Sequence, residues 1–337
     1  MKKISILDCT LRDGGSLNNY LFGEENILQI FQMLNNANIV IIETCFIDNN
    51  KKEDKNCSIN PSNTFFDNLS TRISNKKCHA VAMVDLCKYN LANFNITESK
   101  NLDGIRIMFK KEQLNSAIDF AQKIKQLNYK TILNPVSITS YSNEELNILF
   151  EKTNKLNPYT IYIIDTYGLL NTKETSDLYD IFNKNLNKEI TIGYHSHNNL
   201  QLSFANSIEI INKADDRNII IDASLYGMGK RAGNAPIELI AQYMNTNKNK
   251  DYNLNILTTI IEEKIAPLLK TFEWGYSLIH YTAATNKCHS DYVSYLYREK
   301  NLPFEEINRI LKLINENQKL TFNKQHIDNI LTGVKNG

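Results

Sequence analysis

Two histidines one residue apart, in the segment "YHSHNN", have the spacing to bind one metal ion together. His195 and His197 end a run rich in β-branched residues, and side chains two positions apart along a strand point to the same face. Two imidazoles on one face are a natural chelate for a divalent metal. A carboxylate from a neighbouring strand would complete a facial ligand set that leaves positions open for a substrate. Alone, the pair is weak evidence, because neighbouring histidines often only form hydrogen bonds.

The start of the chain offers such a carboxylate, in the segment "ISILDCTLRDGG". An apolar run, residues 4–8, leads into Arg12 and Asp13, which precede Gly14 and Gly15. A permanently charged guanidinium is suited to hold negative charge that develops in a reaction. Two glycines let the backbone turn tightly with no Cβ in the way of a ligand. The alternative interpretation is a solvated surface turn, in which Asp and Gly are ordinary residues.

Short and long apolar patterns alternate through most of the chain. Eight runs rich in β-branched residues are predicted as strands, at residues 4–8, 39–46, 79–85, 104–109, 130–136, 160–165, 189–195 and 218–224. Amphipathic stretches between them are predicted as helices, including residues 24–37, 112–127, 143–156, 200–212 and 235–244. Ser142 and Glu145 have the spacing of a capping box at the start of the third of these helices.

Eight consecutive β–α units predict an α/β fold, a (β/α)8 TIM barrel, in about 245 residues. A doubly wound open sheet is the alternative, but no G-x-G-x-x-G follows the first strand, which weakens its dinucleotide-binding form. Further along, residues 254–272, 276–300 and 303–320 read as helices without strands. We therefore expect a barrel at residues 1–248 and a helical C-terminal domain at residues 249–337. The polar stretch 46–63 is expected to be a long loop, and a tolerated insertion is favoured over a lid.

The overall composition is that of an ordinary globular protein, with 42% hydrophobic and 22% charged residues. A net charge of +1 argues against a bulk electrostatic role on nucleic acid or on an anionic membrane. None of the six cysteines forms a C-x-x-C pair, so they are expected to be reduced thiols. No stretch approaches the roughly 18 apolar residues of a membrane span, and the N-terminal apolar run is too short for a signal peptide. We therefore expect a soluble, cytoplasmic protein that binds neither nucleic acid nor membrane.

Polar residues at the C-terminal ends of barrel strands are candidates for an active site. In chain order these are Arg12, Asp13, Glu43, Arg106, Asn134, Asp165, His195, His197 and Asn234. In a closed barrel the first and seventh strands are separated only by the eighth, so Asp13 can meet the histidine pair. The sequence therefore predicts a metal site formed by Asp13, His195 and His197.

Three segments of the chain are similar to motifs of a known enzyme superfamily: "LDCTLRDGG", "YHSHNNLQLSFANSI" and "GMGKRAGNAPIEL". In this order they resemble the DRE-TIM metallolyase superfamily of metal-dependent aldolases, lyases and Claisen-condensing enzymes, over about residues 4–246. The superfamily has an HMG-CoA lyase-like domain, and 4-hydroxy-2-oxovalerate aldolase is the member that the chain most resembles. The resemblance implies that Asp13, His195 and His197 bind the metal and that Arg12 stabilises an enolate. Asn234 would be a further ligand or lie beside the metal.

The chain departs from these relatives at the groups that transfer protons. Ser16 stands where 4-hydroxy-2-oxovalerate aldolase has a histidine base. Gly15 and Ser16 replace the Glu and Gln of the R-D-G-E-Q motif in Claisen-condensing enzymes. The catalytic cysteine of the lyase aligns with Lys230 or Arg231. Proton transfer would therefore need a water molecule or another residue.

Two candidates for proton transfer lie in the helical segment. "WGYSLIHY" resembles the start of the helical domain of the oxovalerate aldolase, where a tyrosine approaches the substrate. Tyr276 and His280 are four residues apart and would share a helix face. The alternative is that both residues pack against the barrel. Ser16, Glu43, Arg106, Asn134 and Asp165 are expected to bind the substrate.

The preferred functional hypothesis is an aldolase that cleaves or forms a 4-hydroxy-2-oxo acid through a pyruvate enolate. Its expected cofactor is Mn²⁺ or Mg²⁺ rather than Zn²⁺ or Co²⁺, because the ligand set lacks thiolates. A Schiff-base aldolase that uses Lys110 is disfavoured by this metal set. Two alternatives are a Claisen-type acyltransferase that condenses acetyl-CoA with a 2-oxo acid, and a partner-dependent or non-catalytic subunit. A homo-oligomer and an aldehyde dehydrogenase partner are left open, as the resemblance implies.

Overall fold

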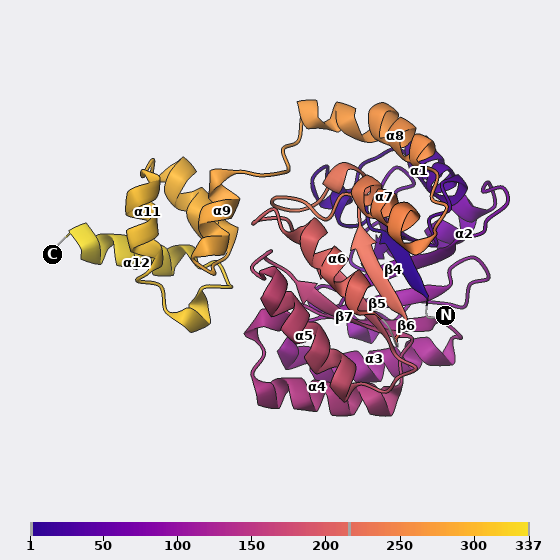
Figure 1. Cartoon of the computed structure of the whole chain (residues 1–337), viewed down its shortest axis with the longest axis horizontal. Helices are drawn as coiled ribbons and strands as arrows, with labels where there is room; N and C mark the ends of the chain where they lie inside the picture. The colour runs from indigo at the N-terminus through magenta and orange to yellow at the C-terminus, as the bar shows by residue number, and fades with distance from the viewer. Residues whose placement is uncertain (1–2, 215–216, 336–337) are drawn as a thin grey trace.

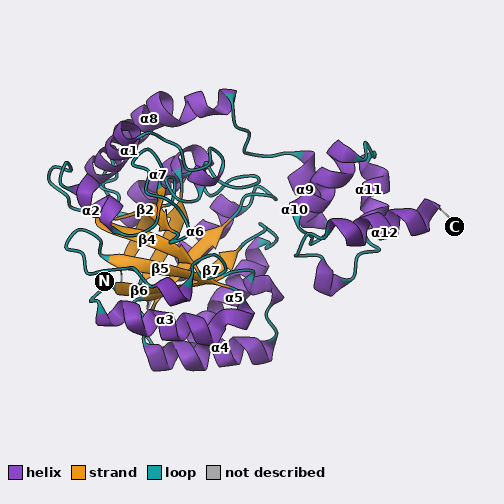
Figure 2. Ribbon diagram, turned by 180° about the vertical axis from the view of Figure 1, so that it is seen from behind, coloured by secondary structure: helices purple, strands orange, loops and turns teal. Residues whose placement is uncertain are grey.

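The computed structural model describes residues 3–214 and 217–335, and its centre is a closed barrel of eight parallel strands (Figures 1 and 2). In barrel order the strands are β1 (Ile4–Asp8), β2 (Ile41–Ile47), β4 (His79–Asp85), β5 (Gly104–Phe109), β6 (Lys130–Pro135), β7 (Thr160–Asp165), β8 (Thr191–Ser196) and β9 (Ile219–Ala223). The barrel is closed because β1 pairs with both β9 and β2. The two-residue β3 (Ile59–Asn60) adds to β2. The predicted (β/α)8 barrel is confirmed.

Helices cover the outside of the barrel (Figure 2). They are α1 (Glu24–Asn36), α2 (Thr64–Ser70), α3 (Leu114–Gln126), α4 (Asn143–Leu156), α5 (Thr172–Asn185), α6 (Ser203–Lys213), α7 (Ile237–Lys248) and α8 (Leu254–Ile260). The capping box before α4 is confirmed: the Ser142 hydroxyl accepts from the Glu145 amide at 3.2 Å, and the Glu145 carboxylate accepts from the Ser142 amide at 2.8 Å. This reciprocal pair satisfies amides that the first helical turn leaves free.

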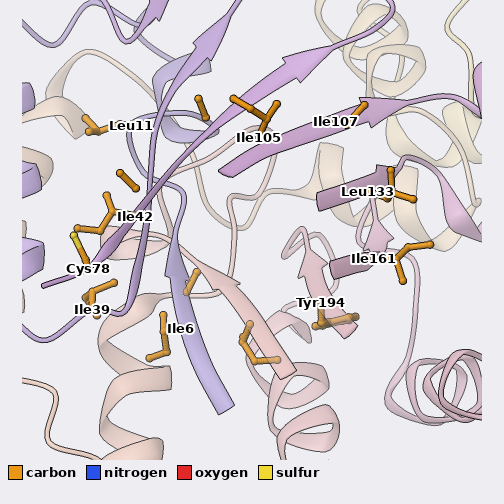
Figure 3. Close-up of a cluster of buried hydrophobic side chains, with 14 of the residues drawn as sticks. Ile6, Leu11, Ile39, Ile42, Cys78, Ile105, Ile107, Leu133, Ile161 and Tyr194 are labelled. Carbon is orange, nitrogen blue, oxygen red and sulfur yellow. The ribbon is translucent and has the colours of Figure 1, made fainter. Parts of the chain in front are cut away.

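Alternate residues of the strands build two separate apolar layers. Outward-facing side chains such as Ile6, Ile42 and Leu133 pack under the helices in the main core (Figure 3). Inward-facing side chains fill the barrel itself, and these are Leu7, Cys9, Ile41, Val81, Ile132, Tyr162, Ile164 and Ile220. The inside of the barrel is therefore a packed core, and the polar groups at its C-terminal end lie directly on this apolar layer.

The C-terminal helices have a hydrophobic core of their own. They are α9 (Leu278–Thr285), α10 (Ser290–Ser294), α11 (Phe304–Leu311) and α12 (Lys324–Lys335). Their buried cluster begins at Ile279 and ends at Ile327, whereas Leu257 and Ile260 of α8 belong to the main core. An extended segment leads from the end of the α8 region to α9, beside the barrel (Figure 1). The domain boundary at residues 248 and 249 stays a prediction, since α8 packs on the barrel.

The polar stretch after β2 is a loop, as expected, but it also contains β3 and packs against the start of the chain. Leu21 and Cys57 form an isolated antiparallel bridge. The Ser58 hydroxyl donates to the backbone carbonyl of Leu11 at 2.6 Å. These contacts hold the loop beside the turn that carries Arg12. Among the described residues, no helix combines the length and the apolar character needed to cross a membrane.

A glycine in β8 makes room for the aromatic side chain at the centre of the inner layer. A Cβ at Gly193 would lie 2.4 Å from ring carbons of Tyr162. We expect Gly193→Ala to lower the free energy of unfolding by about 1–3 kcal/mol, because the packed barrel cannot absorb an added methyl without moving the ring. Denaturant unfolding measures this difference.

Gly333 in α12 is the matched control, because a Cβ there meets no atom within 4 Å. Gly333→Ala should leave the protein equally stable or stabilise it by up to ~1 kcal/mol through helix propensity. Equal stability of the wild type and Gly193→Ala would contradict the packing argument.

Candidate metal centre

One aspartate and two histidines meet at the C-terminal end of the barrel. The ligand atoms of Asp13, His195 and His197 all lie within 4.8 Å of one another. Asp13 follows β1, His195 is in β8, and His197 comes just after β8. The side chains are buried, with exposed fractions of 4–5%. The structure therefore brings together the three residues that the spacing and the barrel order predicted.

Hydrogen bonds at the Nδ1 atoms orient both imidazoles. The Nδ1 atom of His195 lies 3.0 Å from a carboxylate oxygen of Asp222, and that of His197 lies 3.2 Å from the carbonyl oxygen of Gly233. Both partners are acceptors, so each Nδ1 is assigned the proton and each Nε2 keeps its lone pair. Burial lowers the pKa of His197 to about 3, although Asp13 acts in the opposite direction. His197 is therefore neutral near pH 7, which is the form that binds a metal.

Asn234 lies beside the three ligands with one atom unsatisfied. Its amide nitrogen donates to Asp13 at 2.9 Å and to the Met228 carbonyl at 3.1 Å. Its amide oxygen is buried and has no hydrogen-bond partner in the described chain. A Cβ at Gly229 would lie 2.3 Å from the Asn234 nitrogen and 2.7 Å from an Asp13 oxygen, so only glycine fits against this pair. An orphaned oxygen next to a carboxylate and two imidazoles fits a hard or borderline divalent metal.

Arg12 is held rigidly beside this cluster. Its Nε donates to Glu43 at 2.7 Å and its Nη1 donates to Asp13 at 2.8 Å. Burial alone would lower the pKa of the guanidinium, but Glu43 and Asp13 outweigh it and raise this pKa. In the same way, burial would raise the pKa of Asp13, but Arg12 and the histidines hold it well below its usual range. Nη2 of Arg12 has no hydrogen-bond partner among the described residues, so this charged group has a donor left for a ligand.

Glu43 and Arg106 lie beneath the metal centre and not at its surface. Arg106 donates to Glu43 at 2.9 Å and to Asp222 at 2.6 Å. Both Arg106 and Glu43 have an exposed fraction of 0%, and the guanidinium carbon of Arg106 stacks 4.4 Å above the centre of the Tyr162 ring. These two residues were expected to touch the substrate, but in this structure their charged atoms contact protein groups.

A continuous series of buried ion pairs and one hydrogen bond connects two of the candidate ligands, Asp13 and His195, beneath the metal centre. Its members, in order of contact, are Asp13, Arg12, Glu43, Arg106, Asp222 and His195. Asp222 was not among the predicted site residues. Its signal in the sequence is a single carboxylate inside the β-branched run "NIIIDAS", where an unpaired charge would be costly to bury.

Asp165, Ser16 and Asn134 have structural partners at the same end of the barrel. The two carboxylate oxygens of Asp165 accept from the Leu169 and Leu170 amides at 2.9 and 3.0 Å, and burial raises its pKa to about 6. The Ser16 hydroxyl donates to the Asp13 carbonyl at 2.6 Å. With its amide oriented to satisfy both of its atoms, Asn134 accepts from Arg106 at 3.0 Å. Their expected role in substrate binding stays a prediction.

Tyr276 and His280 are not brought to the metal centre by any contact within residues 3–214 and 217–335. The Tyr276 side chain is 57% exposed, and its nearest aromatic partner is Tyr281. Burial lowers the pKa of His280 to about 4, and the charges that act on it are Arg231, Arg298 and Asp291. Their predicted help in proton transfer therefore stays untested, and α9 as placed gives it no direct support.

Two groups that were not predicted also lie close to the centre. Cys9 forms a second cluster with His195 and Asp222, but burial raises its pKa well above the usual value and its thiol donates to the Ala223 carbonyl at 3.3 Å. In this structure the Cys9 thiol keeps its proton and is bonded to a backbone carbonyl. The Tyr20 ring lies against Gly15, where a Cβ would come within 2.8 Å of it, and Arg12 is the charge that acts on its phenol most strongly.

A family model described as HMGL-like matches residues 3–266. Curated relatives include 4-hydroxy-2-oxovalerate aldolases from Pseudoalteromonas translucida, 22% identical over 80% of this chain and 77% of the relative, and from Geobacillus genomosp. 3, 26% identical over 72% and 70%. An oxaloacetate decarboxylase from Mycobacterium tuberculosis is 20% identical over 70% of this chain and 68% of the decarboxylase.

Solved structures share the fold. The N-terminal domain of a Bacteroides vulgatus protein has a TM-score of 0.75 and 25% identity, over 88% of this chain and 98% of that domain. HMG-CoA lyase from Bacillus subtilis has a TM-score of 0.59 and 14% identity, over 79% of this chain and 95% of the lyase. Aldolases, a decarboxylase and a lyase are thus all similar to this chain.

We expect His197→Ala and Asp13→Asn to abolish stoichiometric binding of Mn²⁺, because each removes one of three converging ligands. Asp222→Asn should weaken binding about 10–100-fold, since it keeps all three ligands but loosens the orientation of His195 and weakens the pairing of Arg106. Metal content after equilibrium dialysis measures both effects.

The control is His79→Gln, because His79 pairs with Asp103 at the start of β4, at the other end of the barrel. This variant should bind Mn²⁺ like the wild type. Full occupancy in both His197→Ala and Asp13→Asn would exclude this cluster as the metal centre.

Proposed function

The chain belongs to the HMGL-like family, and we propose that it is a divalent-metal-dependent aldolase that cleaves or forms a 4-hydroxy-2-oxo acid through the enolate of pyruvate. The observation that carries this proposal is the buried cluster of Asp13, His195 and His197 with the guanidinium of Arg12 held against it. Two of the curated relatives described above are 4-hydroxy-2-oxovalerate aldolases, which supports this member of the family over others.

We propose Mn²⁺ or Mg²⁺ rather than Zn²⁺ or Co²⁺ as the metal. A carboxylate, two imidazoles and the free oxygen of Asn234 are available, whereas the thiol of Cys9 keeps its proton. When bound, the metal would act as a Lewis acid that polarises the 2-oxo group of the substrate. Asp13, His195 and His197 would hold it, with Asn234 as a further ligand.

Arg12 would stabilise the negative charge that appears on the oxygen when the carbon–carbon bond breaks. Two carboxylates already fix its Nε and Nη1, so its free Nη2 can donate without reorganisation of the site. A lysine at this position has no planar fork and cannot bond Glu43, Asp13 and a substrate oxygen in one geometry. The rigidity of Arg12 is therefore part of the proposed catalysis.

The proton of the 4-hydroxyl group needs an acceptor other than Ser16, whose hydroxyl is bonded to the Asp13 carbonyl. We propose a water molecule, with the Tyr20 phenol as the protein group that hydrogen-bonds to it. Burial raises the pKa of Tyr20 to about 12, so the phenol keeps its proton near pH 7 and would position the water by accepting a hydrogen bond from it. The water would pass the 4-hydroxyl proton on to solvent, and the enolate carbon of pyruvate would take up one proton in return. Tyr276 and His280 stay as the alternative assistants.

The Claisen alternative has less support. Its motif places a glutamate side chain where this chain has Gly15, and a Cβ there would lie 2.8 Å from the Tyr20 ring. A partner-dependent or non-catalytic subunit is the remaining alternative. Within the aldolase proposal, a 2-oxo acid is the substrate, and a homo-oligomer or an aldehyde dehydrogenase is the proposed partner of the helical segment.

We expect the protein with Mn²⁺ to exchange the methyl protons of pyruvate with deuterium from the solvent, without any aldehyde. Arg12→Ala should abolish this exchange, and Arg12→Lys should be nearly as impaired. Proton NMR of pyruvate in D₂O follows the reaction. Free thiol released from acetyl-CoA and a 2-oxo acid, with no exchange, would favour the Claisen reaction instead.

Tyr20→Phe should slow retro-aldol cleavage about 10²-fold, at the low end for the loss of a general acid–base group. Tyr276→Phe is the matched control, since its ring is exposed and removed from the centre, and it should retain wild-type turnover. Pyruvate release from 4-hydroxy-2-oxopentanoate measures both variants. The reverse order of effects would assign the role to the helical segment.

A further inference from the structure

The loop after β9 places Lys230 directly beside the metal centre. The Lys230 amide is 3.4 Å from the Oδ2 atom of Asp13, and the Lys230 carbonyl accepts from the Gly233 amide at 2.9 Å. A Cβ at Gly229 would lie 2.7 Å from the same Asp13 oxygen, so the residue before Lys230 is packed tightly against this candidate ligand. The backbone of Lys230 therefore has a fixed position next to Asp13.

Arg12 and Lys230 lie on opposite sides of the Asp13 carboxylate. Its Oδ1 atom accepts from Nη1 of Arg12 at 2.8 Å. Its Oδ2 atom accepts from the Asn234 amide at 2.9 Å and faces the Lys230 amide. A ligand that binds beside Asp13 would therefore have one basic residue on each side.

The Lys230 side chain extends across the mouth of the barrel. Burial lowers its pKa, and among the charges that act on it Asp13 raises this pKa, whereas Arg12 and Lys88 lower it. Lys88 follows β4, and the order of strands from Lys230 is β9, β1, β2 and β4. These charges can act on one ammonium group only if the side chain passes over Arg12 and Asp13 toward the middle of the mouth.

Lys230 is the basic group of this loop that is available to a ligand. The neighbouring Arg231 is engaged elsewhere, since its guanidinium donates to the Thr166 carbonyl at 3.2 Å and stacks 4.8 Å from the centre of the Tyr167 ring. The ammonium group of Lys230, in contrast, has no hydrogen-bond or ion-pair partner among the residues that the structure describes. Its side chain is also accessible to solvent.

Lys230 would lack a counter-charge when Asp13 holds a cation. The four charges that act on it most strongly are Asp13, Arg12, Lys88 and Arg231. Asp13 is the one acid among them. Two further acids near the mouth have cations of their own, because Asp85 lies 4.0 Å from Lys88 and Glu43 is buried between two arginines. An anionic group of a ligand would therefore replace the charge that Asp13 gives to the metal.

We propose that the ammonium group of Lys230 binds the carboxylate of the 2-oxo acid, on the side of Asp13 opposite to Arg12. The inference rests on the proposed function, which supplies a 2-oxo acid as the substrate. Such an acid carries its carboxylate and its 2-oxo group on adjacent carbons, so Lys230 and Arg12 can each bind one of them. Lys230 thereby selects 2-oxo acids over uncharged ketones, and no covalent bond to it forms or breaks.

Calorimetric titration of the Mn²⁺-loaded protein with pyruvate tests this role without turnover. Lys230→Met keeps an unbranched side chain and removes the charge. We expect it to raise the Kd of pyruvate about 10–100-fold, because one charge-assisted hydrogen bond is lost. Lys230→Arg keeps the charge and should restore most of the affinity. An unchanged Kd in Lys230→Met, or no pyruvate binding in the wild type, would overturn the proposal.

Lys110→Met is the matched control. Lys110 follows β5 at the same end of the barrel, but it lines a cavity whose walls include none of the four candidate metal ligands. The loss of this charge should leave the Kd of pyruvate unchanged. Lys230→Met should also keep its Mn²⁺ after dialysis, since only its backbone amide faces Asp13. Loss of Mn²⁺ in Lys230→Met, with Lys230→Arg equally impaired, would assign a structural role instead and overturn the proposal.

Pyruvamide separates the effect of charge from the effect of shape, because a neutral amide replaces the carboxylate. The preference of the protein for pyruvate over pyruvamide, expressed as the ratio of the two Kd values, should fall about tenfold or more in Lys230→Met. If Lys230→Met weakens the binding of both compounds by the same factor, Lys230 does not recognise the carboxylate and the proposal is wrong.

Pyruvate exchange in D₂O separates failure of this inference from failure of the aldolase proposal. We expect Lys230→Met to raise the KM of exchange with little change in kcat, since the carboxylate is bound equally before and during enolisation. Exchange with an unchanged KM overturns only the role of Lys230. If the wild type shows no exchange but its pyruvate binding depends on Lys230, the aldolase proposal fails and the carboxylate site remains.

Discussion

Two arginines and three carboxylates lie buried in line beneath the metal centre, and the positions of the ligands depend on them. Arg106 bonds both Glu43 and Asp222, and these in turn hold Arg12 and His195. Removal of one member of a buried ionic set is typically far more costly than its formation is favourable, because its partner is left unpaired. The positions of Asp13 and His195 are therefore connected through the same set of buried ion pairs. When all members are ionised, one negative charge is in excess, which a divalent cation would offset.

The three candidate metal ligands could be predicted from the sequence because they depend on strand periodicity and on the number of strands. Side-chain alternation placed His195 and His197 on one face, and the closure of eight strands brought Asp13 to them. Depth inside the barrel is harder to predict. Arg106 is three residues before the end of β5 and Glu43 is four residues before the end of β2, so they lie roughly 10 and 13 Å below the ends of their strands at about 3.3 Å per residue. The ends of these two strands were predicted to within a residue, at 46 and 109, but the sequence did not show that polar side chains well inside them would pair with one another below the surface. Asp222 was missed because a single acid in an apolar run has no spacing partner.

The helical segment shows the limit of a role transferred by resemblance. Tyr276 and His280 do not share a helix face as the spacing predicted, because α9 begins at Leu278 with Ser277 as its N-cap, which leaves Tyr276 in the connecting segment. Trp274 anchors that segment, since its indole nitrogen donates to the Tyr226 carbonyl at 3.0 Å. Beyond it, α9 joins the separate core that begins at Ile279. No local pattern in the sequence specifies the direction that a chain takes after such an anchor.

The C-terminal helices contact the loop after β9 through His289 and Arg231, and this contact does not set the positions of the metal ligands. Nδ1 of His289 accepts from the Asp291 amide at 3.1 Å, and its Nε2 faces the guanidinium of Arg231 at 3.3 Å. A neutral imidazole can accept at only one nitrogen, so it satisfies one of these two donors and not both. Ring packing on Tyr167 therefore carries much of this contact. All four groups proposed to hold the metal come from the barrel and its loops, so the C-terminal helices line a cavity beside the barrel without setting the geometry of the ligands.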